Sequence, residues 1–352
     1  MSGRLSSGTV PRGRTTAPWV LLSGAAVAAL SGAVRFLVPV SRTADGPAGV
    51  RTDDGVELWT EVLGRADAPV TVVFAHGFAS DAQEFRYQCQ ALERRARVVV
   101  FDQRGHGRSG WGTYRSASID RLGQDLGEVI DQPAGEGPIV LVGHSMGGMA
   151  VISLAGQRPE LFGPRITGVA LLSTAAGHLP KMEMPDRVAH VAVRAGLAKA
   201  AAWSLWLLAP AIDRVAPFRR PWGRRWLLKQ LFGDDQPSPE VSSGVQDTLA
   251  RTQQSVVSAF YPAMVAYNRT DSLSVFRRIP TLVLTGDRDR TIPWQRGRFI
   301  AETIGDRTRF VSVPGAGHMV NLTLAQAVND ALAELLDRTE TAPRPSASSC
   351  VP

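Results

Sequence analysis

Residues 139–148 read IVLVGHSMGG, and this stretch decides the fold of the chain. It opens with four aliphatic residues, the composition of a strand buried on both faces of a parallel sheet. Ser145 then stands between glycines at positions 143 and 147. A sharp turn from a strand into a helix needs small residues two positions before and after its centre, because side chains there would collide with neighbouring backbone. The stretch therefore predicts a strand, a tight turn that lifts the Ser145 hydroxyl, and a helix over 146–157.

Short apolar runs rich in β-branched residues recur on both sides of this stretch. Segments with helical spacing lie between and after the runs, at 81–93, 117–131, 146–157 and 322–337. A hairpin around an Asp-Gly turn is predicted for 50–63. Strands that alternate with helices predict an α/β fold with a mostly parallel central sheet and helices on both faces. The predicted strands are 70–74, 98–101, 139–142, 169–172, 281–284 and 310–313.

One long segment interrupts the alternation. Residues 175–279 contain helical patterns and no clear strand, and they are too many for an ordinary connection. We expect them to form a helical cap inserted into the core, which then comprises 50–174 and 280–338. The Pro/Ser/Thr-rich tail, 339–352, is expected to be disordered.

A nucleophilic serine requires a base and an acid from elsewhere in the chain. A hydroxyl is a poor nucleophile unless a base takes its proton, and His318 follows the last predicted strand in a Pro-Gly-Ala-Gly-His loop. The base needs a carboxylate that fixes its tautomer. Asp287 and Asp289 both follow the strand at 281–284. We assign Asp289 as the acid and expect Asp287 to cap the turn by accepting backbone N–H bonds.

The tetrahedral intermediate of acyl transfer needs two backbone N–H donors, an oxyanion hole. One predicted donor is Met146, the residue after the nucleophile. The other is Phe78, in the His-Gly-Phe loop that follows the strand at 70–74. We interpret His76 of that loop as structural. The same interpretation applies to two residues of the polar turn after the next strand, Asp102 and His106.

Jointly, these motifs resemble the α/β-hydrolase family over roughly residues 50–338. The motifs are Gly-His-Ser-Met-Gly, His-Gly-Phe, Asp-x-x-Gly-x-Gly-x-Ser, Gly-Asp-Arg-Asp and Gly-x-Gly-His. The resemblance implies that the insertion is the family's cap, and that the order Ser145, Asp289, His318 is the family's order. The tight turn that carries Ser145 between strand and helix is called the nucleophile elbow. Dehalogenases and epoxide hydrolases of the family carry Asp at this elbow, so Ser145 argues against both activities. The His-Gly-Gly-Gly pattern of some lipases is absent.

We therefore expect a serine hydrolase that cleaves carboxylic esters, esterase- or lipase-like, through an acyl-enzyme on Ser145. Its substrate would be a small-molecule or lipid ester, with no metal and no organic cofactor. One alternative is another reaction on the same three residues, by a C–C hydrolase, thioesterase, acyltransferase or cofactor-free haloperoxidase or perhydrolase. The other is a non-catalytic, membrane-anchored binding protein of the same fold.

Charge and the N-terminus bear on location. The formal net charge of +7 permits attraction to an anionic membrane surface. Nucleic acid is not expected as a partner, since no zinc-finger spacing, basic zipper or basic arm is present. Arginines precede an apolar stretch that begins at Trp19, so 1–40 is predicted to be a signal or membrane anchor, followed by a linker over 41–49. We expect membrane association with an extracytoplasmic catalytic domain, or secretion after signal cleavage. The oligomeric state is left open.

Overall fold

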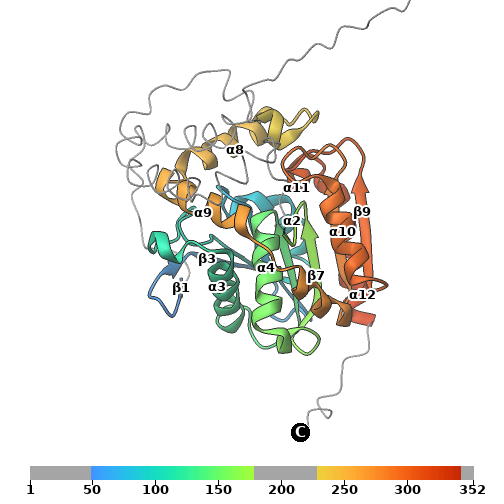
Figure 1. Ribbon diagram of the computed structural model, residues 1–352. Coiled ribbons are helices and arrows are strands. Elements are labelled where there is room, and N and C mark those ends of the chain that lie inside the picture. The colour runs from blue at the N-terminus through green and yellow to red at the C-terminus, as the bar shows by residue number, and fades with distance from the viewer. Residues whose placement is uncertain (1–48, 178–227, 342–352) are drawn as a thin grey trace, which may run out of the picture.

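A central sheet organises the part of the chain that the computed structural model describes, residues 49–177 and 228–341 (Figure 1). Its strands, and the small hairpin before it, are β1 (Val50–Arg51), β2 (Glu57–Leu58), β3 (Thr60–Gly64), β4 (Thr71–Ala75), β5 (Arg97–Phe101), β6 (Ile139–His144), β7 (Ile166–Leu172), β8 (Thr281–Gly286) and β9 (Thr308–Val313). The seven strands of the sheet are ordered β3-β5-β4-β6-β7-β8-β9. β3 is antiparallel to β5, and the other neighbours pair in parallel, which confirms the predicted α/β architecture.

The predicted N-terminal hairpin differs from the observed one in its second arm. β1 and β2 pair antiparallel, with Val50 opposite Leu58, as expected around the Asp-Gly turn. The run then breaks at Trp59, whose backbone N–H donates to the Ser109 hydroxyl at 2.9 Å. The chain resumes as β3, which joins the edge of the main sheet beside β5. One predicted strand thus serves two sheets.

Helices occupy most of the predicted positions. They are η2 (Ala82–Phe85), α2 (Arg86–Leu92), η3 (Tyr114–Ser116), α3 (Ile119–Asp131), α4 (Met146–Gln157), η4 (Pro159–Leu161), α8 (Pro239–Arg251), α9 (Gln254–Ala266), η5 (Thr270–Arg278), α10 (Trp294–Ile304), α11 (Val320–Thr323) and α12 (Ala325–Thr341). α4 matches its prediction, whereas 81–93 and 322–337 each divide into two helices. α12 continues past residue 338, the predicted end of the core. α10 was not predicted. Its buried face consists of Gly297, Ile300 and Ile304, and two apolar side chains are too few to show helical spacing.

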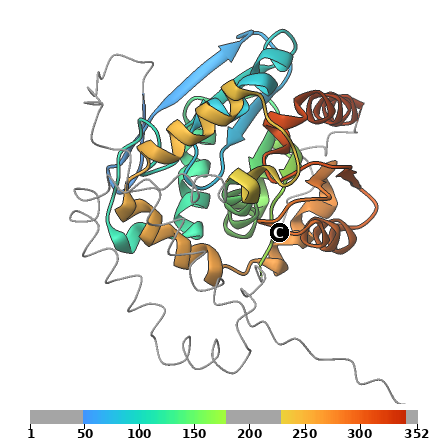
Figure 2. The ribbon, with the colours of Figure 1, turned by 90° about the horizontal axis from the view of Figure 1, so that it is seen from above.

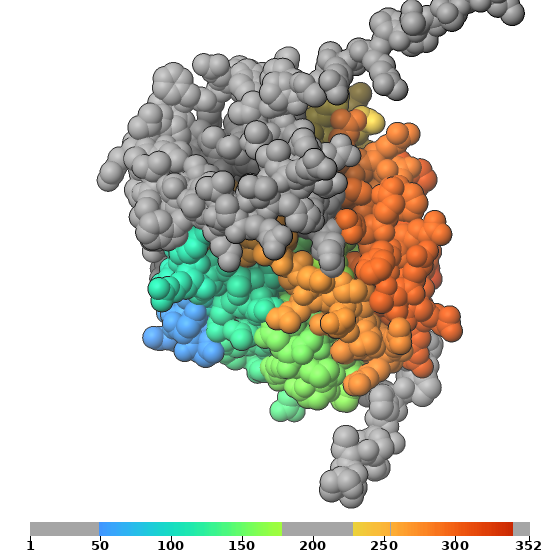
Figure 3. Space-filling view, in the orientation of Figure 1, coloured from blue at the N-terminus to red at the C-terminus, as the bar shows by residue number. Residues whose placement is uncertain are grey.

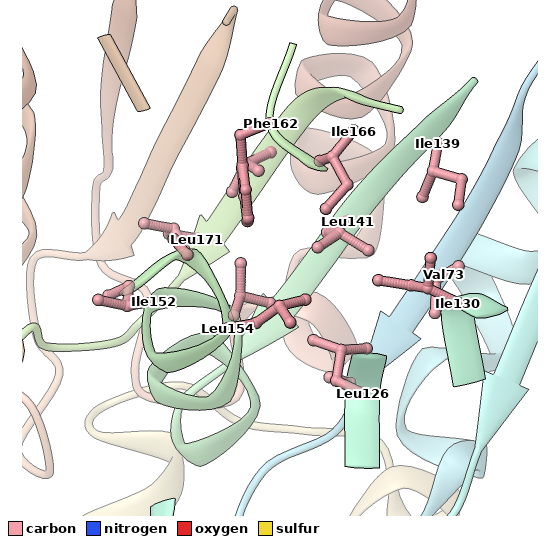
Figure 4. Packing of buried hydrophobic residues seen from close by; sticks show 14 of the residues in the cluster. Val73, Leu126, Ile130, Ile139, Leu141, Ile152, Leu154, Phe162, Ile166 and Leu171 are labelled. Carbon is pink, nitrogen blue, oxygen red and sulfur yellow. The ribbon is translucent and has the colours of Figure 1, made fainter. Parts of the chain in front are cut away.

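Both faces of the sheet are covered, as a parallel sheet requires. α3, α4, η5 and α10 cover one face. Figure 4 shows Leu126 of α3 and Leu154 of α4 in the same buried cluster as Val73 and Leu141 of the strands. On the opposite face, α2 and α12 pack against a second set of strand residues. The sheet is therefore fixed between two apolar layers, and the loops at its strand ends are held in place.

The described part of the predicted cap, 228–279, contains a helical stretch that ends at residue 232, then α8 and α9, and last η5, which instead belongs to the layer of α3, α4 and α10 on the sheet. Seen from above, α8 and α9 lie across the rest of the molecule (Figure 2), and the parts before and after the gap form one continuous surface (Figure 3). The two ends of the insertion meet at the core. Gly177 and Asn268 form an isolated β-bridge, and the Arg269 N–H donates to the Ala176 carbonyl at 2.7 Å.

The predicted N-terminal segment, 1–40, lies outside the described residues, as do 178–227 of the cap and 342–352 of the tail. Among the residues that are described, no helix combines the length and apolar character needed to cross a bilayer.

Candidate active site

The strand order places the candidate site at one point on the sheet edge. β4 is followed in the chain by β5 on one side of it and later by β6 on the other. The loops after two such neighbouring strands run in opposite directions, and a crevice forms between them at the carboxyl ends of the strands. Ligands bind in this crevice in open α/β sheets. Ala75 at the end of β4 pairs with Gly143 near the end of β6. The His-Gly-Phe loop and Ser145 therefore emerge side by side.

Ser145 occupies a strained turn between β6 and α4. Its φ of 52° and ψ of −117° lie in a region that L-residues rarely adopt. A Cβ on Gly147 would come within 2.0 Å of the Ala75 carbonyl oxygen, and one on Gly143 within 2.6 Å of the Gly147 oxygen. Only glycine fits at either position, which is the physical reason for the predicted motif. α4 also directs its free N-terminal N–H groups toward this point.

A residue that the sequence did not reveal supports this turn from the next strand. The Thr174 hydroxyl, just after β7, donates to the Ser145 carbonyl at 2.6 Å. A Cβ on Gly148 would come within 2.7 Å of the Thr174 side chain, so glycine is required there for this close contact. A threonine after a strand carries no sequence signal for this contact, because the pairing depends on the neighbouring elbow.

His318 and Asp289 come together as predicted. The His318 Nδ1 lies 2.7 Å from Asp289 Oδ2, and both residues are buried. The other carboxylate oxygen, Oδ1, accepts the N–H groups of Thr291 and Ile292, each at 2.8 Å. Since a carboxylate accepts, Nδ1 carries the proton, which leaves Nε2 free to receive one. This is the tautomer that a general base needs.

Asp287 has a different partner. Its Oδ1 accepts the Gly315 N–H at 2.7 Å, and its side chain is 38% exposed. It fixes the loop that carries His318, as expected for a turn-capping carboxylate.

The loop of His318 also lies against the residue that precedes the nucleophile. The rings of His144 and His318 have centroids 4.8 Å apart. The His144 Nε2 lies 3.0 Å from the His318 carbonyl oxygen. Ser145, His318 and Asp289 thus reach one region from β6, β9 and β8.

The two predicted oxyanion donors flank the same point. Met146 is the first residue of α4, and Gly147 brings that helix against the end of β4, where the loop to Phe78 begins. The Gly77 N–H donates to Glu84 Oε2 at 3.1 Å, which fixes the loop just before Phe78. The role of the Phe78 and Met146 N–H groups as oxyanion donors stays a prediction.

The polar turn after β5 supports this loop, as the sequence suggested. Asp102 accepts the Ala82 N–H and the Arg108 N–H, each at 2.8 Å. The Gln103 N–H donates to His76 Nε2 at 2.9 Å. His106 is fully buried, and burial, with a smaller effect of His76, lowers its pKa to about 3. These histidines are therefore held in the interior as structural groups.

Apolar side chains surround the elbow. Met146 and Met149 of α4 share a buried cluster with Phe260 of α9 and Ile292 of the acid loop, and Phe78 packs against it. An acyl group that reached Ser145 would meet apolar surface from the core and the cap. Within 49–177 and 228–341, no group of three or more His, Cys, Asp or Glu residues is arranged to hold a metal ion.

The elbow, the buried Asp–His pair and the strand order define a class. A family model described as "Alpha/beta hydrolase family" matches residues 72–331. The chain belongs to this family.

Individual relatives of the chain include esterases and a haloperoxidase. The chain is 28% identical over 288 residues to a bifunctional esterase/perhydrolase of Acinetobacter calcoaceticus, covering 80% of this chain and 96% of that protein. It is 24% identical to a non-heme haloperoxidase of Rhodococcus erythropolis, covering 82% and 98%. A solved structure, the thermophilic esterase of Thermogutta terrifontis, superposes with a TM-score of 0.66 at 26% identity, covering 84% and 99%.

Proposed function

We propose that the protein hydrolyses carboxylic esters through an acyl-enzyme on Ser145. The observation that carries the proposal is the buried His318–Asp289 hydrogen bond beside a serine in a strained turn. The names of the esterase relatives and the apolar cluster around the elbow support the same substrate class.

The reaction follows from the roles of three groups. The Ser145 Oγ attacks the acyl carbon while its proton passes to His318 Nε2. The N–H groups of Phe78 and Met146 would stabilise the oxyanion. His318 then gives its proton to the leaving alcohol. Water attacks the acyl-enzyme and loses a proton to His318, which returns it to the Ser145 oxygen as the carboxylic acid leaves.

The test is hydrolysis of p-nitrophenyl esters, from acetate to palmitate, by the full chain beside its Ser145→Ala variant. Turnover by the parent and its loss in the variant are expected, and the preferred chain length measures the acyl site. A fluorophosphonate probe should label the parent and not the variant. A well-folded parent that neither turns over nor labels would overturn the enzyme assignment in favour of a binding protein.

A perhydrolase reaction is a second candidate, because one relative is named as both esterase and perhydrolase. Hydrogen peroxide would replace water in the second step and release a peracid instead of the acid. Adding peroxide to the ester assay and measuring peracid by halide oxidation separates the two reactions. The C–C hydrolase, thioesterase and acyltransferase alternatives are separated by profiling the corresponding substrates.

A further inference from the structure

Two buried ionisable side chains, Glu84 and His144, lie among the loops of the candidate site without a role in the reaction above. Each side chain is 1% exposed, and Glu84 Oε1 lies 2.7 Å from His144 Nδ1. The other carboxylate oxygen of Glu84 accepts the Gly77 N–H at 3.1 Å. The other ring nitrogen of His144 lies 3.0 Å from the His318 carbonyl oxygen. The pair therefore contacts the oxyanion loop, the elbow and the loop of the base.

The contacts fix the protonation of the pair. A carbonyl oxygen only accepts, so His144 Nε2 carries a proton. Nδ1 lies 2.7 Å from an oxygen of the Glu84 carboxylate, and the negative charge of that carboxylate favours a second proton on the ring, which is then an imidazolium. Burial would by itself raise the pKa of Glu84, but the charge of His144 and its contact lower that pKa to about 2. Burial would likewise lower the pKa of His144, but Glu84 raises it.

Further bonds join the same elements. The backbone carbonyl of Glu84 accepts the Asn321 side-chain N–H at 3.1 Å. Gln88, one turn further along, donates from its side chain to the Asn321 carbonyl at 3.0 Å. η2 and α2 are thereby fastened to α11, directly after His318. A buried charge pair with one removed partner is strongly unfavourable, so this connection resists any change that separates the loops.

We propose that Glu84 and His144 are positioning residues, which hold the oxyanion loop and the loop of His318 in register with Ser145 through a buried ion pair. The inference rests on the proposed function, because register matters only if these loops cooperate in a reaction. Displacements of about 1 Å in such a constellation reduce turnover by as much as about a hundredfold.

The ring of His144 also lies against the base, with its centroid 4.8 Å from that of the His318 ring. Among the described residues, the other titratable groups that act on the pair are His76, from the loop after β4, and Asp289, from the loop after β8. Neutralising Glu84 should release the extra proton of His144 and abolish the ion pair.

The test is Glu84→Gln, which keeps an oxygen acceptor for the Gly77 N–H and removes the charge. We expect kcat to fall about tenfold or more, with a smaller change in KM. The kcat/KM profile against pH should also change, because the two charges of the buried pair are lost from among the loops of the site. Glu84→Gln combined with His144→Gln should not restore the profile, because the charges are not restored.

The matched control is Glu302→Gln, which neutralises an exposed carboxylate paired with Arg298 on α10 and should leave kcat and the profile unchanged. Folding of every variant is checked by circular dichroism. A folded Glu84→Gln protein with parental kcat and pH profile would overturn the proposal, and so would a loss of stability with an unchanged profile.

A measurement on the unaltered protein covers the case in which the variants do not fold. In nitrogen-15 spectra of the histidine rings, one fully buried ring should stay protonated on both nitrogens above neutral pH. A singly protonated His144 would refute the ion pair. Fluorophosphonate labelling of Ser145 tests the proposed function separately, since its failure would remove the reaction while the ring spectra still report on the pair.

Discussion

Asp287 and Asp289 stand two positions apart after β8, and their partners differ. Asp289 holds the His318 ring, whereas Asp287 holds the backbone at Gly315. We expect Asp289→Asn to lower kcat by about 10⁴-fold with the fold intact, because an amide no longer fixes the tautomer of the base. Asp287→Asn, the matched control, should reduce kcat less than about tenfold. Ester turnover with circular dichroism checks both, and a reversed order would reassign the acid.

His106 gives a pH dependence of stability with a definite sign. Its pKa is lowered from 6.5 to about 3 in the folded protein, so between these values the unfolded chain binds a proton that the folded protein does not. The free energy of unfolding should therefore fall as pH falls below 6.5, by about 1.4 kcal/mol per unit from this group. His144, whose pKa is raised, adds stability that is fully present below 6.5 and is lost only at higher pH.

Urea unfolding across this range, for the parent and His106→Phe, measures the effect. The phenylalanine variant cannot take up the proton. Its free energy of unfolding should therefore change less with pH, by about 1.4 kcal/mol per pH unit. Equal slopes would show that His106 is not the titrating group.

Which site residues the sequence revealed depends on how local their signals are. Ser145 was predicted because steric demands of one turn fix the two glycines beside it. Asp289 and His318 each follow a recognisable strand, so their position on the sheet edge could be derived. Glu84 was missed, although Glu84 and Gln88 stand one helical turn apart, on the same side of the segment 81–93 as its apolar residues. A polar pair on a buried stripe signals a buried network but not its partner, which lies 60 residues along the chain.

At the scale of elements, Arg104 connects three of them. Its guanidinium is fully buried and bonds to Asp125 of α3 at 2.7 Å and to Asp54 of the β1–β2 turn at 2.8 Å. We expect Arg104→Met to lower the free energy of unfolding by about 3 kcal/mol, because the buried Asp125 loses both of its bonds from Arg104 and keeps only the one from Arg121 at 2.9 Å. Urea unfolding measures this. Arg298→Met, which breaks a surface pair, should cost no more than about 1 kcal/mol. A similar cost for both would mean that the bond from Arg121 is sufficient for Asp125.

The position of a helix or strand could be predicted where its apolar residues follow one clear pattern, and not elsewhere. α3 and α4 carry clear helical spacing, and the buried strands are continuous apolar runs. The break at Trp59 could not be predicted, since it depends on Ser109, which lies far along the chain. The division of 322–337 into α11 and α12 falls at Leu324, whose backbone (φ −125°, ψ 49°) is not helical, and the spacing of the apolar residues does not mark this break.

At the scale of the whole molecule, we propose from the sequence that residues 1–40 associate the protein with a membrane, with the catalytic domain outside the cytoplasm. The full chain should then sediment with the membrane fraction, because a basic start before an apolar run directs insertion. A chain lacking residues 1–40 should stay in the supernatant. Protease added to intact cells should cut the full chain if the domain is outside. Recovery of the full chain in the soluble cell extract would contradict the proposal, and recovery in the medium would favour cleavage and secretion.

The bridge between Gly177 and Asn268 has a consequence for how such proteins diversify. Because the departing and returning chain meet at one hydrogen-bonded point, the segment between them leaves and rejoins the core without interrupting the pairing of β7 with β8. The two positions are natural splice sites for chimaeras. A foreign insert joined there would have to supply its own acceptor for the Gly317 N–H, which Asp235 provides here at 3.0 Å, and would bring its own choice of substrate.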